Sequence, residues 1–266
     1  MTSDRLPTST AHQARLRLFQ PTRRPVYQQT ELTTSWGVVR IKGRLGQTHA
    51  DVMEAMFRCA EKRGAIIDSD GRQRLKLLVD PAKVRKIARQ NNTNGLERMI
   101  NDILGAVIEI RSPEHLQCKG HLIDLVENAV DSRGQKLTAY NPLNKGVRAL
   151  WRVVIGEVGL RLLDGDFRLY YDPGPVAQLR HGVSQAVIRF LRGHDKSKPP
   201  NGGWALDTVL LAVCGEQMSS SQRRDRRREV REDKGALSKL GIIIDGDRIH
   251  VEQKHGSVEQ MPETVE

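Results

Sequence analysis

Cysteine is scarce in this 266-residue sequence, and its placement excludes two classes of protein. The three cysteines, Cys59, Cys118 and Cys214, are odd in number and far apart in the chain. Two of them fall on helix faces that we predict to be apolar. We therefore expect the three cysteines to be small core residues of a protein in a reducing compartment. We do not expect them to form a disulfide framework or a metal site.

Long apolar segments are absent as well. No run approaches the roughly 18 consecutive apolar residues of a membrane-spanning helix, and no apolar signal-peptide core follows Met1. We therefore expect a soluble protein of the cytoplasm with no membrane partner.

The sequence also lacks the common motifs of catalysis. It contains no Gly-x-x-x-x-Gly-Lys-Ser/Thr, Gly-x-Gly-x-x-Gly, His-Glu-x-x-His or Cys-x-x-Cys motif. The eight histidines are dispersed, and we expect His49 and His121 to be capping, core-edge or surface residues. The tyrosine pair Tyr170-Tyr171 lies on an alternating strand, where packing explains it better than nucleophilic attack on DNA. We predict no catalytic residue, no metal ligand and no cofactor, which disfavours a nuclease or nicking enzyme.

Positive charge is abundant, and much of it is concentrated in one segment. Lys and Arg number 43 against 32 Asp and Glu, which gives a net charge of +11 and favours a polyanionic partner. The densest run is 223–231, which holds six arginines. Before it, Leu206, Val209, Leu210 and Val213 have the spacing of one helix face.

The segments around this arginine run predict a winged helix-turn-helix. Hydroxyls at Ser219 to Ser221 can cap a second helix, on which Val230, Leu237 and Leu240 lie inward. Gly241 ends that helix, and 242–251 predicts a hairpin around Asp245-Gly246. In a winged helix-turn-helix the second helix enters the major groove.

An alternative is that the arginine run is only a solvated helix face, with Asp225, Glu229, Glu232 and Asp233 pairing along it. Position favours DNA contact, because five of the six arginines precede Glu229, near the end of the helix that meets bases. We expect Arg226 to pair internally. The candidates for DNA contact are Ser220, Arg223, Arg224, Arg227, Arg228 and Arg231.

The same order of elements is predicted twice, so the expected fold class is α+β with two tandem winged helix-turn-helix domains. We expect a mobile basic arm over 1–30, a first domain over 31–134 for dimerisation and backbone contacts, a second domain over 135–254 for DNA recognition, and a polar tail over 255–266. In the first domain, hairpins are expected at 65–79 and between 107–110 and 121–127. In the second, strands are expected at 151–163 and 167–171.

With these two units, the chain resembles plasmid replication initiators of the TrfA and RepC type. The resemblance is clearest over 179–253, including Arg189-Phe190-Leu191-Arg192-Gly193-His194, Ala205 to Gly215, the serine cap, the basic helix and the hairpin. It implies a non-enzymatic protein that binds direct repeats (iterons) in double-stranded DNA at an origin. It also implies local opening of the duplex and recruitment of the host initiator and helicase.

Further phosphate contacts and a dimer surface are expected outside the arginine run. The phosphate contacts are Arg85, Lys86, Arg89, Arg248, Lys196 and Lys198. A homodimer in equilibrium with monomer is expected through the hairpin at 66–79, because it carries apolar residues on both faces, including Leu78. A transcriptional or partition regulator with the same DNA chemistry is the alternative function.

Overall fold

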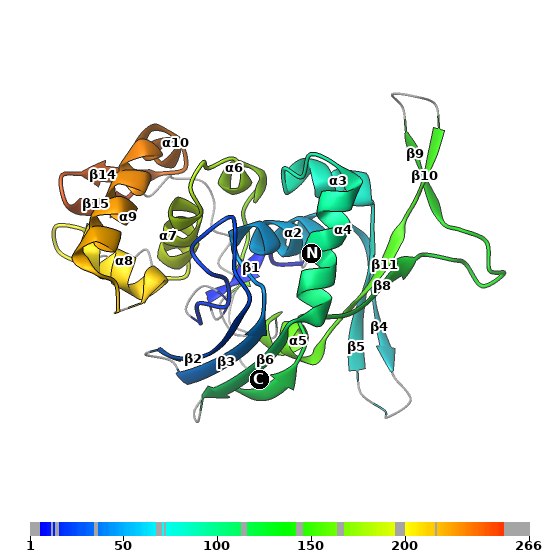
Figure 1. Cartoon of the computed structure of the whole chain (residues 1–266). Coiled ribbons are helices and arrows are strands. Elements are labelled where there is room, and N and C mark those ends of the chain that lie inside the picture. Colours follow the sequence, from blue (N-terminus) through cyan, green and yellow to red (C-terminus); the bar gives the residue numbers. More distant parts are fainter. Residues whose placement is uncertain are drawn as a thin grey trace, which may run out of the picture.

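The structure is a computed structural model that describes residues 6–11, 13, 16–34, 37–67, 71, 73–112, 116–141, 146–163, 168–194, 200–215 and 217–252 (Figure 1). It mixes helices with antiparallel sheets, as the predicted α+β class requires. Its buried apolar side chains form two clusters, one over 16–163 and one over 176–249. We call the parts that hold them the N-terminal unit (6–163) and the C-terminal unit (168–252).

The N-terminal unit contains two four-stranded sheets. The first has the order β2-β3-β6-β7, formed by β2 (Gln28–Thr34), β3 (Gly37–Gly43), β6 (Val107–Ser112) and β7 (Leu116–Gly120). The second has the order β4-β5-β11-β8, formed by β4 (Ala60–Ile67), β5 (Gln73–Val79), β8 (Ile123–Asn128) and β11 (Trp151–Ile155). The helices are α2 (Gln47–Cys59), α3 (Pro81–Ile87), α4 (Thr93–Gly105) and α5 (Glu157–Leu163).

The predicted apolar stripes of these helices form the core. Val52, Ala55, Met56 and Cys59 of α2 are buried, as the spacing predicts. On α4 the residues at 96, 99, 100 and 103 are buried, and the Asn92 side chain caps the helix by accepting from Gly95 N. A two-stranded ribbon of β9 (Thr138–Asn141) and β10 (Gly146–Ala149) projects from this unit (Figure 1).

The C-terminal unit is a group of helices with a small sheet. Its elements are β12 (Arg168–Leu169), α6 (Gly174–Ala177), α7 (Gly182–Arg192), β13 (Trp204–Ala205), α8 (Leu206–Cys214), α9 (Ser220–Glu232), α10 (Lys234–Lys239), β14 (Ile242–Asp245) and β15 (Arg248–Val251). The sheet has the order β13-β15-β14. The stripe predicted on α8 is buried together with Val230 and Leu237, as expected.

The N-terminal segment differs from the expected mobile arm. Leu16 and Leu18 are fully buried in the N-terminal core, and β1 (Ser9–Thr10) pairs with β12. A Cβ on Gly182 would lie 2.5 Å from the backbone of Thr22, so only glycine allows this segment to cross α7 so closely. The prediction of a mobile arm is wrong for the described part of 1–30, because Leu16 and Leu18 are buried in the core and β1 is paired with β12.

Several predicted hairpins and strands also need correction. The segment 151–163 is a strand and a helix, and β11 pairs with β5 and β8. The predicted boundary at 134/135 therefore cuts through a sheet. The hairpin at 66–79 is not an isolated ribbon, because β5 has β11 on its other side. Similarly, β6 pairs with β7, whereas β8 belongs to the second sheet.

Two smaller differences concern the C-terminal unit. The second helix of the predicted pair is interrupted at Asp233, where α9 ends and α10 begins. Of the strand predicted at 167–171, the structure describes only the two residues of β12 as strand. The predicted polar tail at 255–266 lies outside the described residues.

Candidate nucleic-acid interface

Helix α9 begins at a complete side-chain cap. Ser219 Oγ accepts a hydrogen bond from Gln222 N (3.2 Å), and Gln222 Oε1 accepts one from Ser219 N (2.9 Å). This reciprocal pair satisfies two donors that the first turn would otherwise leave free. The predicted serine cap is confirmed, and it fixes where the arginine run enters the helix.

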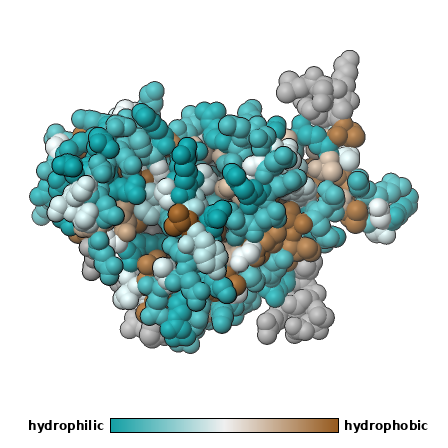
Figure 2. Space-filling view, viewed as in Figure 1, coloured by the Kyte–Doolittle hydropathy of each residue, from teal (hydrophilic) through white to brown (hydrophobic). Residues whose placement is uncertain are grey.

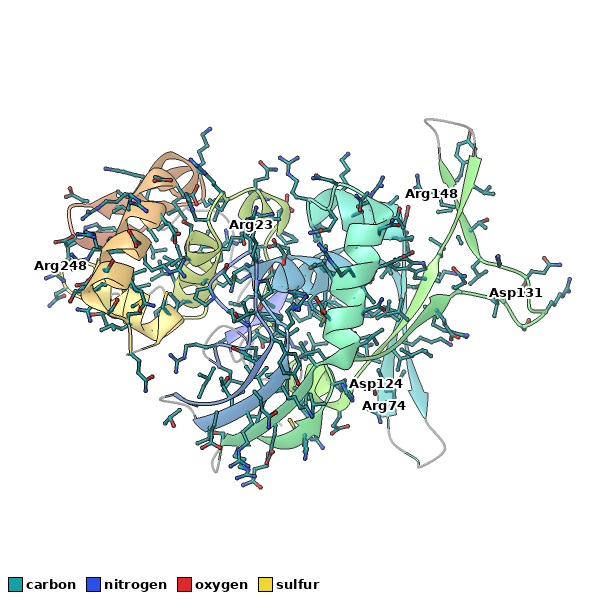
Figure 3. All side chains as sticks on the ribbon, in the orientation of Figure 1. Arg23, Arg74, Asp124, Asp131, Arg148 and Arg248 are labelled. Carbon is teal, nitrogen blue, oxygen red and sulfur yellow. The ribbon has the colours of Figure 1, made fainter. Side chains whose placement is uncertain are left out.

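Val230 anchors α9 to the unit. It is the only residue of α9 that is buried, and it packs in a cluster with α7 and α8. The rest of the helix lies on the surface of the C-terminal unit (Figures 1 and 3). A helix held by one apolar residue leaves nearly all of its polar face available to a partner.

The candidate contacts on α9 fall into two groups by exposure. Ser220, Arg224, Arg228 and Arg231 are exposed, whereas Arg223 and Arg227 are partly buried on the flank. A shallow surface hollow is lined by Arg224, Arg227, Arg228, Arg231 and Glu232. The structure therefore brings four of the six candidates around one concavity.

Acidic neighbours hold most of these arginines in ion pairs. Arg226 Nη1 lies 2.7 Å from Glu229, which confirms the expected internal pair. Arg228 lies 3.3 Å from Asp225 and 3.8 Å from Glu232. Such exposed pairs contribute only about 0–1 kcal/mol each, so phosphate oxygens can replace the carboxylates at small cost. Within α9 the six arginines still outnumber the three acidic residues.

Arg227 has a structural partner that the sequence analysis missed. Its guanidinium donates two hydrogen bonds to Asp207, including Nε to Oδ1 at 2.6 Å. The hydrogen bond from Arg227 lowers the pKa of Asp207, which lies in the first turn of α8. This pair joins α8 to α9, and among the exposed arginines of α9 it leaves Arg224 without an ion pair to a described residue.

The β14–β15 hairpin lies beside the second half of α9. Arg231 Nη2 donates to Asp247 Oδ1 (2.7 Å) in the turn of the hairpin. Arg248, at the start of β15, is exposed and donates to Gly203 O (3.4 Å). Both cations therefore border the face that Arg224 and Arg228 present.

The remaining predicted contacts lie elsewhere. Arg85 is half-buried and Lys86 and Arg89 are exposed, all at α3 of the N-terminal unit. Figure 1 shows α3 well separated from α9, with α6 and α7 between them. Lys196 and Lys198 lie outside the described residues. The structure thus forms one basic group on α9 and a second on α3.

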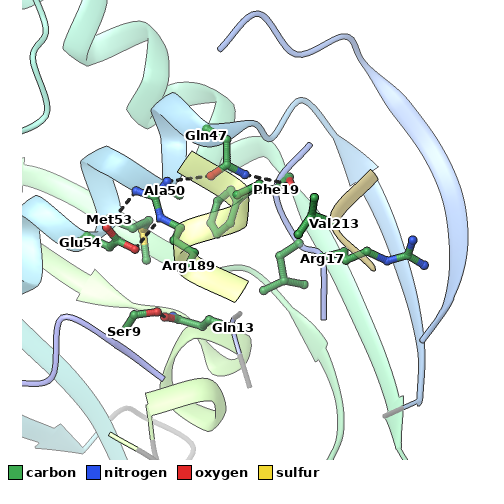
Figure 4. A pocket seen from close by; sticks show the side chains of 12 residues that line it. Ser9, Gln13, Arg17, Phe19, Gln47, Ala50, Met53, Glu54, Arg189 and Val213 are labelled. Atoms are coloured by element: carbon green, nitrogen blue, oxygen red, sulfur yellow. Dashed lines mark hydrogen bonds and ion pairs between the residues drawn. The ribbon is translucent and has the colours of Figure 1, made fainter. Parts of the chain in front are cut away.

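A buried polar cluster fixes the C-terminal unit against α2 (Figure 4). Arg189 of α7 donates to Glu54 (2.8 and 2.9 Å), to Asp51 (2.7 Å) and to Gln47 Oε1 (2.7 Å). Tyr171 OH donates to Glu54 Oε1 (2.6 Å). Burial lowers the pKa of Arg189, but Glu54 and Asp51 outweigh that effect, and the net pKa is well above the ordinary value.

The sequence analysis missed this cluster, although it contained a signal. Arg189 interrupts the apolar face of α7, and Asp51 and Glu54 are buried on α2. A charged residue inside an apolar helix face needs a partner, and that rule identifies Arg189 from sequence but not its partners. The packing role expected for Tyr170-Tyr171 holds for Tyr171, whereas Tyr170 is exposed.

Other kinds of site find little support in the described residues. Among them, no group of three or more His, Cys, Asp or Glu side chains could hold a metal ion. No described helix is both long enough and apolar enough to cross a bilayer. Cys59, Cys118 and Cys214 are free thiols, and burial raises the pKa of each to about 11.

His49 and His121 have structural roles. Nδ1 of His49 accepts a hydrogen bond from Gly46 N (3.0 Å) at the start of α2, and its Nε2 donates to Asp102 (3.3 Å). His121 Nδ1 donates to Ala106 O (2.9 Å). The expected capping and core-edge roles of these two histidines are confirmed.

Comparison with known proteins provides no relative. No protein-family model, no curated protein and no solved structure matches this chain.

Proposed function

We propose that this chain is a non-enzymatic plasmid replication initiator that binds repeated double-stranded sites (iterons) at an origin. The observation that carries the proposal is the face of α9, where a capped helix exposes Arg224, Arg228 and Arg231. Arginine on an exposed helix can donate two hydrogen bonds to a guanine edge in the major groove.

The order of elements in the C-terminal unit supports a winged-helix arrangement. Helix α7, strand β13, helices α8 and α9 and the β14–β15 hairpin follow one another as such a domain requires. In this arrangement α9 is the recognition helix, α8 crosses the DNA backbone and the hairpin is the wing. We assign a second winged helix to the N-terminal unit, with α4 in the recognition position and α3 supplying backbone contacts.

The surface of α4 supports this division of labour. Its exposed residues include Glu97, Arg98 and Asn101, so the helix offers phosphates little positive charge. The N-terminal unit then serves in dimerisation and in clamping the backbone. Copies bound to adjacent repeats strain the neighbouring duplex, and the host initiator and helicase act on the opened strands.

A footprint on the DNA that flanks the gene tests this function. We expect protection of evenly phased direct repeats, spaced by whole helical turns of about 10–10.5 base pairs. Protection of a single palindrome would instead identify a transcriptional or partition regulator. Absence of sequence-dependent protection would contradict both functions.

Dimerisation can be tested at Leu78, the half-buried residue that first suggested an interface. It lies in β5, opposite Lys62 on one neighbouring strand and Arg152 on the other. We expect Leu78→Lys to lower the dimer fraction in sedimentation at micromolar protein, because a charged side chain would replace an apolar one at the proposed interface. If the dimer fraction is unchanged, the face around Leu78 is not part of the dimer interface. The same conclusion follows if the variant also binds a single repeat more weakly.

A further inference from the structure

The β9–β10 ribbon is firmly mounted although it projects from the body. Three backbone hydrogen bonds close its base: Ala129 N to Leu150 O (2.8 Å), Leu137 N to Ala129 O (2.8 Å) and Leu150 N to Leu137 O (2.9 Å). Ala129 and Leu150 are buried there. The ribbon therefore has a defined direction, which a flexible loop would not have.

A buried carboxylate joins the ribbon to α3. Arg148 of β10 donates to Asp80 Oδ2 (2.5 Å), and Asp80 Oδ1 accepts from Ala82 N (2.9 Å) as the cap of α3. Asp80 is fully buried. The ribbon and the basic residues of α3 are thus held in one fixed arrangement, and Figure 3 shows Arg148 at the root of the ribbon.

The opposite face of the ribbon exposes an apolar pair. Tyr140 is 62% exposed and Val147 is 71% exposed, and the two lie directly opposite each other on the paired strands. They share this face with Thr138, which is also exposed. Figure 2 shows hydrophobic atoms at the edge of the molecule where the ribbon projects. An aromatic and a β-branched side chain that lie next to each other and are exposed to water form an apolar surface. Such a surface favours contact with a partner.

Positive charge lies in the segments next to the ribbon, in the loop before β9 and on α3, which Arg148 joins to the opposite face. The neighbouring loop carries Arg133 and Lys136, both exposed and without an ion pair to any described residue. Arg85 and Lys86 of α3 likewise form no ion pair within the described part of the chain. Asp131 is the one acidic residue in the sequence between Ala129 and Leu150, and its carboxylate accepts from Arg133 N and Gln135 N.

We propose that this ribbon is a second DNA-contacting element, which enters a groove of the flanking duplex at a distance from the site read by α9, since the two lie at opposite ends of the molecule in Figure 1. The inference rests on the proposed function and extends it. Tyr140 and Val147 contact base edges or wedge at a base step, and Arg133 and Lys136 contact the flanking phosphates.

Charge and shape both select DNA as the occupant. A second copy of the ribbon would bring the same positive charge against this one, whereas a duplex brings phosphates. A DNA groove admits a two-stranded ribbon, and apolar side chains inserted at a base step kink the duplex. Such a kink in the flanking duplex would supply the strain that opening requires.

The test uses the full chain with Tyr140 and Val147 both changed to Ser. The matched control changes Val26 and Tyr27 to Ser, since these neighbours are 68% and 57% exposed elsewhere on the chain. Two duplexes are compared, one holding the footprinted repeat alone and one extended by two helical turns, about 21 base pairs. Affinity is measured by fluorescence anisotropy, and the bend by energy transfer between dyes at the ends of the longer duplex.

We expect the ribbon variant to bind the extended duplex about tenfold more weakly, the loss typical of one aromatic stacking contact. Its bend should decrease, while its affinity for the short duplex and its thermal unfolding stay unchanged. The Val26 and Tyr27 variant should match the parent on both duplexes. Equal binding and bending by the ribbon variant, or an equal loss in the control, would overturn the assignment.

A photo-crosslinking benzoylphenylalanine at position 140 separates this inference from the proposed function. Crosslinks to DNA support the ribbon as a DNA element, and crosslinks to a second copy overturn it in favour of an assembly surface. Either result leaves α9 unaffected. If Arg224→Ala binds the repeat as the parent does, the proposed function fails. The crosslink to a mixed-sequence duplex at low salt then still tests whether the ribbon contacts DNA.

Discussion

The arginines of α9 differ in how free their guanidinium groups are. Arg227 is held by Asp207, Arg226 by Glu229 and Arg231 by Asp247. Arg228 has longer contacts, to Asp225 (3.3 Å) and Glu232 (3.8 Å), and Arg224 forms no ion pair with a described residue. The Nε of Arg223 is buried and has no hydrogen-bond partner among the described residues. A free, exposed arginine loses the least when it moves to a base edge.

We therefore expect Arg224→Ala or Arg228→Ala to cost about 1–3 kcal/mol of specific binding, the contribution of one base contact. Both side chains are exposed, so thermal unfolding should stay within about 0.5 kcal/mol of the parent. Anisotropy titrations on the protected repeat measure the loss. Arg226→Ala is the control, since it removes the same charge from the inner edge of the same helix. An equal loss in that control would mean that net charge, rather than the exposed face, determines binding.

His49 makes the stability of the N-terminal unit depend on pH. Burial lowers the pKa of His49, although Asp102 acts in the opposite direction. Its Nδ1 must stay unprotonated to accept from Gly46 N. Because the folded pKa is lower than the unfolded one, stability is fully present above the unfolded value of about 6.5 and is lost as the pH falls from there through the folded pKa.

The variant His49→Asn tests this dependence, since its amide oxygen accepts the same hydrogen bond and takes up no proton. We expect urea unfolding of the parent to show a loss of stability that begins near pH 6.5 and grows as the pH falls toward the lowered folded pKa of His49. The loss in the variant should be smaller. Identical losses in the two proteins would show that His49 is not responsible.

The two faces of α3 differ in polarity. Asp80 caps it, Pro81 occupies its first turn and Val84 is buried, so Arg85 and Lys86 are left on the outer side. Arg85 is half-buried and Lys86 is an exposed point charge, so we expect this face to contact the DNA backbone rather than base edges. Its two cations are suited to phosphates.

Changing both Arg85 and Lys86 to Ala should weaken binding evenly across DNA sequences. The slope of log K against log salt should become shallower by about 0.9 for each phosphate that the variant no longer neutralises. Titrations at several salt concentrations, on the repeat and on a scrambled duplex, measure both effects. A change in the preference for the repeat would mean that α3 reads bases.

The two apolar clusters are separate, and the units are joined by the β1–β12 strand pair and by a buried cluster of charged groups. Arg189, Asp51 and Glu54 are all buried between α2 and α7. Arg23 adds a further connection by donating to Ala177 O (3.1 Å) and Leu179 O (2.8 Å). Removal of one partner from such a cluster leaves a buried charge without compensation.

We expect Arg189→Ala to lower the free energy of unfolding by about 3–5 kcal/mol in urea. The control is Arg161→Ala, which removes an exposed pair with Glu157 and should cost about 0–1 kcal/mol. Differential scanning calorimetry would show whether the two units then unfold separately. A loss in the Arg189 variant no larger than in the control would mean that the cluster does not join the units.

Local features were readable from the sequence because their partners lie close in the chain. The cap at Ser219, the apolar faces of α2 and α8 and the turn of the β14–β15 hairpin all depend on spacings of a few residues. The exposure of Arg224 and Arg228 and the internal pair of Arg226 followed from the same helical period.

Only the tertiary structure decided which distant segments meet. Arg189 reaches Asp51 and Glu54 across more than a hundred residues, and β11 joins a sheet whose other strands precede residue 129. Leu16 and Leu18 are core residues because elements from distant parts of the chain pack around them, and no local period marks them. Hydrogen-bond geometry and packing in three dimensions select these partners, whereas a sequence pattern specifies only which residues need one.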